Sequence, residues 1–168
     1  MKKIIYFIAV SACMLLASCQ HKEQPGMTAT VDMAGQWYVQ CDLLDGDEVI
    51  AEDVYGYGHF LVYTYNTAAN DPKEMFLEDS GNFWDFKIRI ACDQAKKTFS
   101  ASAAQNCVED YEDLVCDVTN GKIIYGGATT PSGQKADLIT FDIVFSDDDP
   151  GIVYRMSGWR YTGFEVDD

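Results

Sequence analysis

The stretch that decides the fold is 58-GHFLVYTYNTAANDPKEMFLEDSGNFWDFKIRIAC-92. Its second half predicts one long strand over residues 83–92, in which apolar and charged side chains alternate. Phe86 and Ile88 fall on one face of that strand, whereas Lys87 between them falls on the other. Period-two alternation is typical of a sheet with one face in water and the other buried. The stretch therefore predicts antiparallel strands that enclose an apolar interior.

The rest of the chain continues this pattern and shows no convincing helical stripe. Strands are predicted at residues 34–44, 58–66, 75–78, 83–92, 97–104, 114–118, 122–126, 137–145 and 152–164, with 49–57 a weak strand or a loop. Asn120-Gly121 predicts a hairpin turn, because Asn-Gly accepts the positive φ that tight turns need. An open sheet of about eight strands leaves two edges exposed, and pairing the first strand with the last removes both. The prediction is an all-β, antiparallel lipocalin-like β-barrel of about eight strands, with a β-sandwich as the alternative.

The N-terminus reads as an export signal. Residues 1–18 combine two lysines, a short apolar run and small residues, which is typical of a secretory signal peptide. The sequence Leu16-Ala17-Ser18-Cys19 resembles a bacterial lipobox, which implies cleavage before Cys19 and lipidation of its thiol. Residues 19–33 are then a flexible tether and 34–168 the barrel domain, anchored to a membrane through Cys19. By analogy with other bacterial lipoproteins, Gln20 indicates the outer membrane. An ordinary signal peptide cut elsewhere is the alternative.

Charge and cysteine content limit the partners. The formal net charge of -15 becomes -17 on cleavage, because the signal contains two lysines and no acid. Such a surface disfavours nucleic acid, and we expect a soluble, monomeric domain. Four cysteines remain, Cys41, Cys92, Cys107 and Cys116, which allow three disulfide pairings or buried free thiols. No CxxC or Cys/His cluster is present and no acidic run matches a calcium loop, so we expect no metal and no cofactor.

Two motifs suggest a family. Gly35-Gln36-Trp37 is similar to the Gly-x-Trp start of lipocalins, which implies that Trp37 plugs one end and that Arg155 or Arg160 packs on it. The longer segments 65-YNTAANDP-72 and 81-GNFWDFK-87 resemble a family of bacterial lipoproteins labelled lipid-binding putative hydrolases. The resemblance implies a lipocalin-like barrel, a hydrophobic ligand and, by its label alone, hydrolysis.

The first functional hypothesis is binding of a small hydrophobic or amphipathic ligand, such as a lipid, in the barrel interior. The candidate lining was chosen by face and size, with Arg155 and His59 as the polar groups. It consists of Trp37, Tyr63, Trp84, Phe86, Ile88, Phe141, Ile143, Tyr154, Arg155 and His59. The same residues would equally build a filled core with no cavity.

Two other classes of function stay open. A hydrolase acting on an ester or glycan would need a nucleophile and a base, but no Gly-x-Ser-x-Gly motif is present and no catalytic residue is assigned. Asp85, Glu78 and Asp142 are carboxylates that glycan hydrolysis would require, with no spacing that singles out a pair. The third class is a cell-envelope binding module that uses exposed tyrosines, namely Tyr55, Tyr57 and Tyr161. The loop 67–73 is either a binding loop or a set of structural turns.

Overall fold

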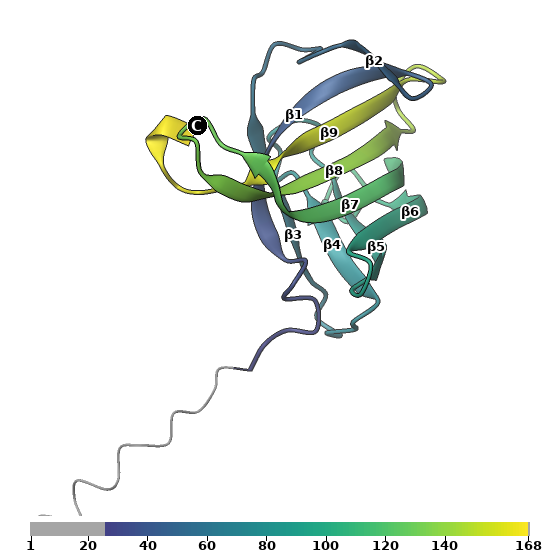
Figure 1. Ribbon diagram of the computed structural model, residues 1–168. Helices are drawn as coiled ribbons and strands as arrows, with labels where there is room; N and C mark the ends of the chain where they lie inside the picture. Colours follow the sequence, from purple (N-terminus) through teal and green to yellow (C-terminus); the bar gives the residue numbers. More distant parts are fainter. Residues whose placement is uncertain (1–25, 168) are drawn as a thin grey trace, which may run out of the picture.

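The computed structural model describes residues 26–167, which form one antiparallel sheet that closes on itself (Figure 1). Strands β1 and β3 to β9 pair in chain order, and β9 returns to pair with β1, so eight strands make the barrel. The short β2 pairs only with the end of β1. The elements are β1 (Gly35–Asp45), β2 (Glu48–Ala51), β3 (Phe60–Asn66), β4 (Glu74–Glu78), β5 (Lys87–Asp93), β6 (Thr98–Gln105), β7 (Val115–Thr129), β8 (Lys135–Phe145), β9 (Val153–Arg160) and the 3-10 turn η2 (Glu165–Asp167). The predicted closed barrel is confirmed, and a single sheet excludes the sandwich.

Closure of the barrel depends on a glycine in the last strand. Eight residues of β1 pair with β9, from Trp37 opposite Arg160 to Leu44 opposite Val153. Within this ladder a Cβ atom on Gly158 would lie 1.9 Å from the carbonyl oxygen of Tyr38, far inside van der Waals contact. The first and last strands can therefore approach each other only because Gly158 has no side chain.

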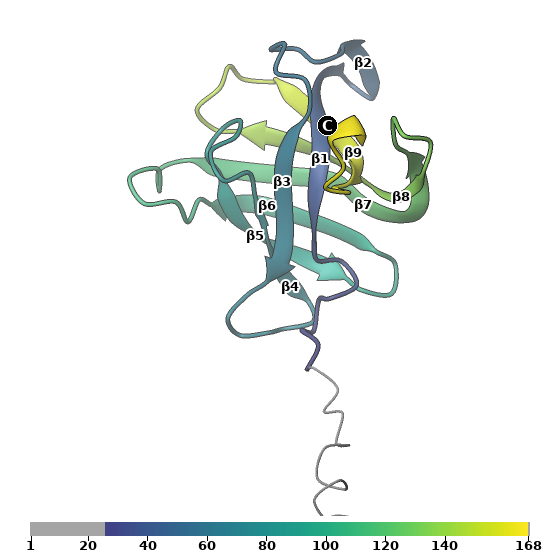
Figure 2. The ribbon, with the colours of Figure 1, turned by 90° about the vertical axis from the view of Figure 1, so that its left-hand side faces the viewer.

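The barrel has two ends with different connections. Because consecutive strands run in opposite directions, alternate connections gather at opposite ends (Figures 1 and 2). Segments 26–34, 67–73, 94–97, 130–134 and 161–167 lie at what we call the Trp37 end. Segments 46–59, 79–86, 106–114 and 146–152 lie at the other, which we call the distal end. The first described residues thus approach the barrel from the Trp37 end.

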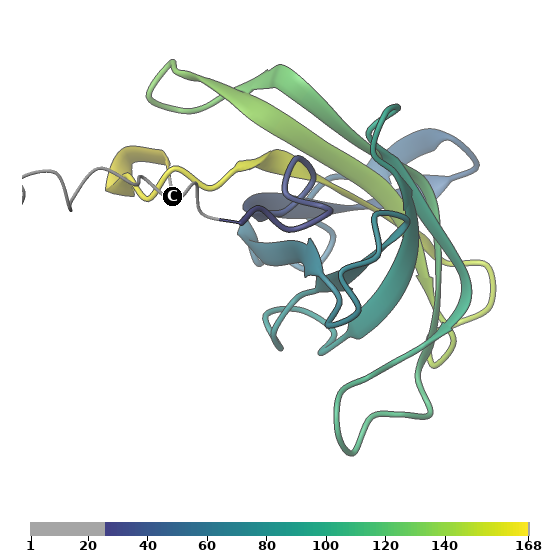
Figure 3. The same ribbon diagram turned by 90° about the horizontal axis from the view of Figure 1, so that it is seen from below.

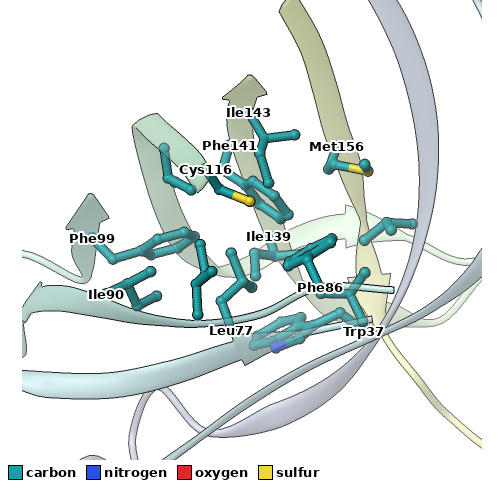
Figure 4. Packing of buried hydrophobic residues seen from close by; sticks show 14 of the residues in the cluster. Trp37, Leu77, Phe86, Ile90, Phe99, Cys116, Ile139, Phe141, Ile143 and Met156 are labelled. Carbon is teal, nitrogen blue, oxygen red and sulfur yellow. The ribbon is translucent and has the colours of Figure 1, made fainter. Parts of the chain in front are cut away.

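The barrel interior is filled by side chains from every one of its strands. Figure 4 shows rings, aliphatic chains and a thiol meeting across it from different strands. Trp37, Leu77, Phe86, Phe141 and Met156 have no exposed area at all. Each fully buried side chain of this size stabilises the fold by roughly 1.5–3 kcal/mol. A lumen wide enough for water would expose part of these side chains, so the middle of the barrel is a packed core.

The Gly-x-Trp motif forms a plug at the Trp37 end. The guanidinium of Arg160 lies over the Trp37 ring, 4.4 Å from its centroid, and donates to the carbonyl oxygen of Ala34 at 2.9 Å. A Cβ on Gly35 would meet this guanidinium at 2.4 Å, so glycine leaves room for it. On the other side, Trp37 Nε1 donates to Thr64 Oγ1 at 2.8 Å. Of the two arginines considered from the sequence, Arg160 occupies the position.

The ordered domain begins earlier than the sequence analysis predicted. Residues 29–33 form a turn rather than a flexible tether, and Met33 is fully buried in the core. Thr64 Oγ1 donates to the carbonyl oxygen of Met33 at 2.6 Å, which ties the turn to β3. The signal segment 1–18 and Cys19 lie outside the described residues.

The predicted hairpin at Asn120-Gly121 is wrong. Asn120 does have a positive φ of 55°, but β7 runs through it and shifts register against both β6 and β8. The dipeptide therefore forms a bulge, which bends the strand around the barrel. The chain reverses instead at 130–134, where Gly133 N donates to Thr130 O at 2.8 Å. This hairpin extends beside the C-terminal turn (Figure 3), and Ser132 N donates to Asp167 there.

The four cysteines of the described chain are all free thiols. Cys41 and Cys116 are buried, and burial raises the pKa of each thiol to about 12, with nearby carboxylates adding to the effect. Cys92 is half-buried and Cys107 is exposed. Residues 26–167 contain no helix with the length and apolar composition needed to cross a bilayer.

We expect Gly158→Ala to lower the free energy of unfolding by about 3 kcal/mol or more, because the added methyl group forces β9 away from β1. Urea denaturation followed by circular dichroism measures the loss. The control is Gly26→Ala, where a Cβ meets nothing within 4 Å. Equal stability of the two variants would contradict the role assigned to Gly158.

Candidate functional site

The distal end of the barrel carries a dense group of aromatic rings, which we call the aromatic cap. The rings come from the loop before β3, the first residue of β3, the loop between β4 and β5, and the facing ends of β8 and β9. The cap consists of Tyr55, Tyr57, Phe60, Phe83, Trp84, Phe145 and Tyr154, which contact one another in a continuous network.

The cap grades from buried rings to exposed ones. Phe60 and Phe145 are buried, and each is covered by a half-buried ring of the β4–β5 loop. Phe83 stacks on Phe60 with centroids 5.1 Å apart, and Trp84 stacks on Phe145 at 4.6 Å with an interplanar angle of 2°. Tyr55 lies over both loop rings and is 47% exposed. The cap therefore continues the apolar core to the solvent surface.

Hydroxyl and indole groups at the edge of the cap bond to acidic residues. Tyr55 donates to the Tyr154 hydroxyl at 2.5 Å, and Tyr154 donates to Asp148 at 2.6 Å. Burial raises the pKa of Tyr154, and its bonds to Asp148 and Tyr55 raise it further. Trp84 Nε1 donates to Asp147 at 3.0 Å. At the rim of the cap, Trp84 and Tyr154 are thus each bonded to a carboxylate.

A buried carboxylate shapes the loop that carries Phe83 and Trp84. Asp79 has no exposed area and accepts five backbone N–H groups. They are those of Gly81 at 3.1 Å, Phe83 at 2.9 Å, Trp84 at 2.7 Å, Asp85 at 3.0 Å and Phe86 at 2.9 Å. Hydrogen bonds to an ionised acceptor are stronger than neutral ones. The backbone wraps around this carboxylate, so β5 begins at Lys87 and the predicted strand start at residue 83 is wrong.

A second buried polar residue joins this loop to the next one. Asn106 accepts from Lys87 N at 2.7 Å and donates to the carbonyl oxygens of Asp85 and Tyr111 at 3.1 and 3.2 Å. Together Asp79 and Asn106 hold two distal loops in fixed positions, so the half-exposed rings are presented on a rigid support.

Most of the predicted lining residues face inward, but they pack against other side chains and do not line a cavity. Trp37, Phe86, Ile88, Phe141, Ile143 and Tyr154 are buried, with exposed fractions of 2% or less. Trp84 is half-buried in the aromatic cap. The sequence therefore identified the inner face, and the structure shows that these side chains fill the interior. Their role in ligand binding stays a prediction.

Three other predicted lining residues lie on the outer surface. Tyr63 alternates with Val62 and Thr64, which face inward; Thr64 takes the inner place because Trp37 bonds to its hydroxyl. Arg155 alternates with the inward Tyr154 in the same way. Side chains of a strand alternate between faces, so large size alone does not place a residue inside.

Arg155 and His59 have partners on that outer surface. Arg155 Nε donates to Asp142 Oδ1 at 2.8 Å, and Nη2 donates to Oδ2 at 3.1 Å. The His59 ring lies 5.3 Å from the ring of Tyr38 and 4.6 Å from that of Trp159. Burial lowers the pKa of His59. Neither residue supplies a polar group to the interior.

The groups considered for hydrolysis are dispersed. The described contacts of His59 are with aromatic rings, not with a serine, threonine or cysteine. Glu78 accepts from Tyr65 and Ser80, and Asp142 is bonded to Arg155. Within residues 26–167, no group of three histidine, cysteine or acidic side chains is arranged to hold a metal ion.

The loop 67–73 lies at the Trp37 end. In the loop 67–73, Asn70 Oδ1 accepts from Ala29 N at 2.8 Å, which fastens the first described residues to the barrel and supports the structural interpretation. Open depressions of about 430 and 610 Å³ lie beside Cys92 at the end of β5, and the smaller one also borders Phe99 and Gly121. Both are open to solvent, so neither encloses a ligand as a lipid pocket does.

The sequence analysis missed Asp79, Phe83, Phe145 and Phe60 as parts of one site. Asp79-Ser80-Gly81 contains a usable signal, because an aspartate before residues with positive φ commonly bonds the backbone ahead of it. Tyr55 and Tyr57 were named as exposed tyrosines, and both lie in the cap.

The fold places the protein among closed antiparallel β-barrels of the up-and-down type. Residues 22–165 match the model of the family described as "Lipid-binding putative hydrolase", and the chain belongs to this family. No curated protein matches the sequence.

We expect Asp79→Asn to lower the free energy of unfolding by about 2–4 kcal/mol, since the amide loses the charge and turns an NH2 group toward backbone donors. The near-ultraviolet circular dichroism of Trp84 should weaken as well. Urea denaturation measures the first effect, and exposed Asp45→Asn, expected within about 0.5 kcal/mol of wild type, is the control. A loss no larger than that of the control would show that the loop does not depend on Asp79.

Proposed function

We propose that this protein binds a small amphipathic lipid at the aromatic cap. The family to which the chain belongs is a lipid-binding one, and the closed barrel is a suitable scaffold for such a ligand. The observation that carries the proposal is the cap itself: half-exposed Phe83 and Trp84 lie over buried rings and under Tyr55. Exposed aromatic surface of this kind, continuous with a core, typically marks a binding site.

The packed interior favours a ligand site at the distal end over one in the middle of the barrel. A ligand among Trp37, Phe141 and Met156 would have to displace side chains that expose no area. At the cap, an acyl chain needs only to lie against or part the outer rings, which retain exposed surface. Burial of apolar area contributes about 25 cal/mol per Å² before the costs of association are subtracted.

The cap also offers groups for the polar part of an amphipathic molecule. Hydroxyls of Tyr55 and Tyr57 and the carboxylates of Asp147 and Asp148 lie around the rings. Ligand sites combine an apolar wall with a few placed polar groups in this way. Since Asp79 fixes the loop, little conformational entropy of the backbone is lost on binding.

We expect monolauroylglycerol, an uncharged single-chain lipid, to bind saturably and to move the indole N–H signal of Trp84 in two-dimensional NMR spectra. The chain has three tryptophans, so their indole signals can be assigned by substitution. Trp37 lies at the opposite end and its signal should stay in place.

Two variants sharpen this test. Tyr57→Ala removes a ring that is 63% exposed and should weaken binding several-fold without unfolding the protein. Phe164→Ala removes a ring of similar exposure at the Trp37 end and should leave binding unchanged. A shift of Trp37 without one of Trp84 would move the site to the interior, and no saturable binding would end the proposal.

We also propose that the protein is a lipoprotein anchored through Cys19 in the outer membrane. The support is the signal-like segment 1–18, the lipobox-like Leu16-Ala17-Ser18-Cys19 and the residue after it, Gln20. The first described residues approach at the Trp37 end (Figure 1), so an anchor there would direct the aromatic cap away from the membrane.

We expect the full-length chain, expressed in bacteria fed an alkyne-labelled fatty acid, to incorporate the label and to fractionate with the outer membrane. Cys19→Ser should abolish both, while Cys107→Ser, which replaces an exposed thiol of the barrel, should change neither. Labelling that survives Cys19→Ser would refute the anchor assignment.

A further inference from the structure

Negative charge is concentrated at the end of the barrel that carries the aromatic cap. The four distal segments, 46–59, 79–86, 106–114 and 146–152, contain thirteen aspartates and glutamates and no lysine or arginine. At the Trp37 end, the connecting segments contain four acids and three lysines. The chain is acidic overall, but its charge is therefore distributed unevenly along the barrel axis.

Some of these acids are in direct contact with the cap rings. Asp147 and Asp148 accept hydrogen bonds from Trp84 and Tyr154. Asp53 accepts from Gly58 N, so its carboxylate lies at the base of the turn that presents Tyr55 and Tyr57. The exposed rings are thus bordered by carboxylates on two sides.

The cations nearest to the distal loops are engaged elsewhere. Lys87 lies 3.8 Å from Glu78 and over the rings of Tyr65 and Phe76 on the outer face. Arg155 is held by both oxygens of Asp142. Neither neutralises the carboxylates around the cap, which leaves a negative potential over an aromatic surface.

We propose that the ligand of the aromatic cap carries a cationic head group, a quaternary ammonium or a protonated amine, attached to its apolar chain. This inference rests on the proposed function, whose site it shares. Aromatic faces attract cations through the ring quadrupole, with Trp and Tyr the best partners. Carboxylates at the rim add Coulomb attraction and raise the local concentration of cations. An anionic lipid meets the same field as repulsion.

The geometry accounts for both parts of such a molecule. Phe83 and the buried rings beneath it offer apolar contact to the chain. Trp84 is bonded to Asp147, and Tyr55 and Tyr57 extend the ring surface toward the turn held by Asp53. A head group there can keep part of its hydration because these rings are half-buried or exposed.

The test compares three amphiphiles with the same twelve-carbon chain and different head groups: dodecyltrimethylammonium, monolauroylglycerol and laurate. All are used below their critical micelle concentrations, with calorimetry for affinity and the Trp37 indole signal to verify that the barrel stays folded. We expect dodecyltrimethylammonium to bind about tenfold more tightly than monolauroylglycerol at low salt, and laurate to bind most weakly. Raising the salt to about 0.5 M should reduce this preference, because exposed charges are screened.

Asp147→Asn isolates the charge, because the amide oxygen can still accept from Trp84 Nε1. It should weaken binding of the ammonium several-fold more than binding of monolauroylglycerol, because the hydroxyls of the uncharged lipid can still bond to the amide. Glu165→Gln, an exposed acid at the Trp37 end, is the matched control and should have no effect.

The outcomes separate the two proposals. Equal affinity for the ammonium and the uncharged lipid, or a preference unaltered by Asp147→Asn and by salt, would overturn the cationic head group while binding at the cap stands. Failure of all three amphiphiles to bind would overturn the proposed function and this inference with it.

Discussion

The pairing of the first strand with the last is the constraint on which the rest of this structure depends. The backbones of β1 and β9 approach so closely at Tyr38 and Gly158 that no side chain fits between them. This contact removes both edges of the sheet and creates an inside. At the Trp37 end of this ladder, Arg160 covers Trp37 and bonds to Ala34, so the strand pairing also seals one end of the barrel.

Once the barrel is closed, the side chains themselves decide where a ligand can go. An eight-stranded barrel is just wide enough to be filled or to hold one small molecule, and here large residues such as Trp37, Phe86 and Phe141 fill it. The apolar surface that remains accessible is at the distal end, where the rings of the aromatic cap extend beyond the packed interior. Scaffold and proposed binding surface are therefore separated along the axis, with the plug at one end and the aromatic cap at the other.

The aromatic cap combines apolar and acidic groups that have opposite requirements for water. Trp84 remains partly exposed with its indole N–H bonded to the exposed Asp147, whereas Tyr154 is buried and only its hydroxyl reaches Asp148. Asp79 is the exception, since it is fully buried and its charge is balanced by five backbone N–H groups. That carboxylate stabilises the loop geometry, whereas the rim carboxylates set the electrostatic potential that a ligand meets.

The sequence by itself determined the fold class and much of the interior. Alternation in β5 and β8 identified the buried side chains, since a strand places successive residues on opposite faces whatever its neighbours. The Gly35-Gln36-Trp37 motif also predicted the plug. Local sequence could not distinguish a turn from a bulge at Asn120, because its positive φ suits both equally well. Only the register of β7 with β6 and β8 selects the bulge.

The tertiary structure alone decided the site. Tyr63 and Arg155 are large or polar enough for a lining, but Thr64 takes the inner place beside Trp37, and Arg155 bonds to Asp142 outside. Tyr55, Trp84 and Tyr154 are 29 to 99 residues apart in sequence and meet only because the barrel closes. Contacts between residues so distant depend on long-range packing and hydrogen bonds, which local patterns of side chains do not encode.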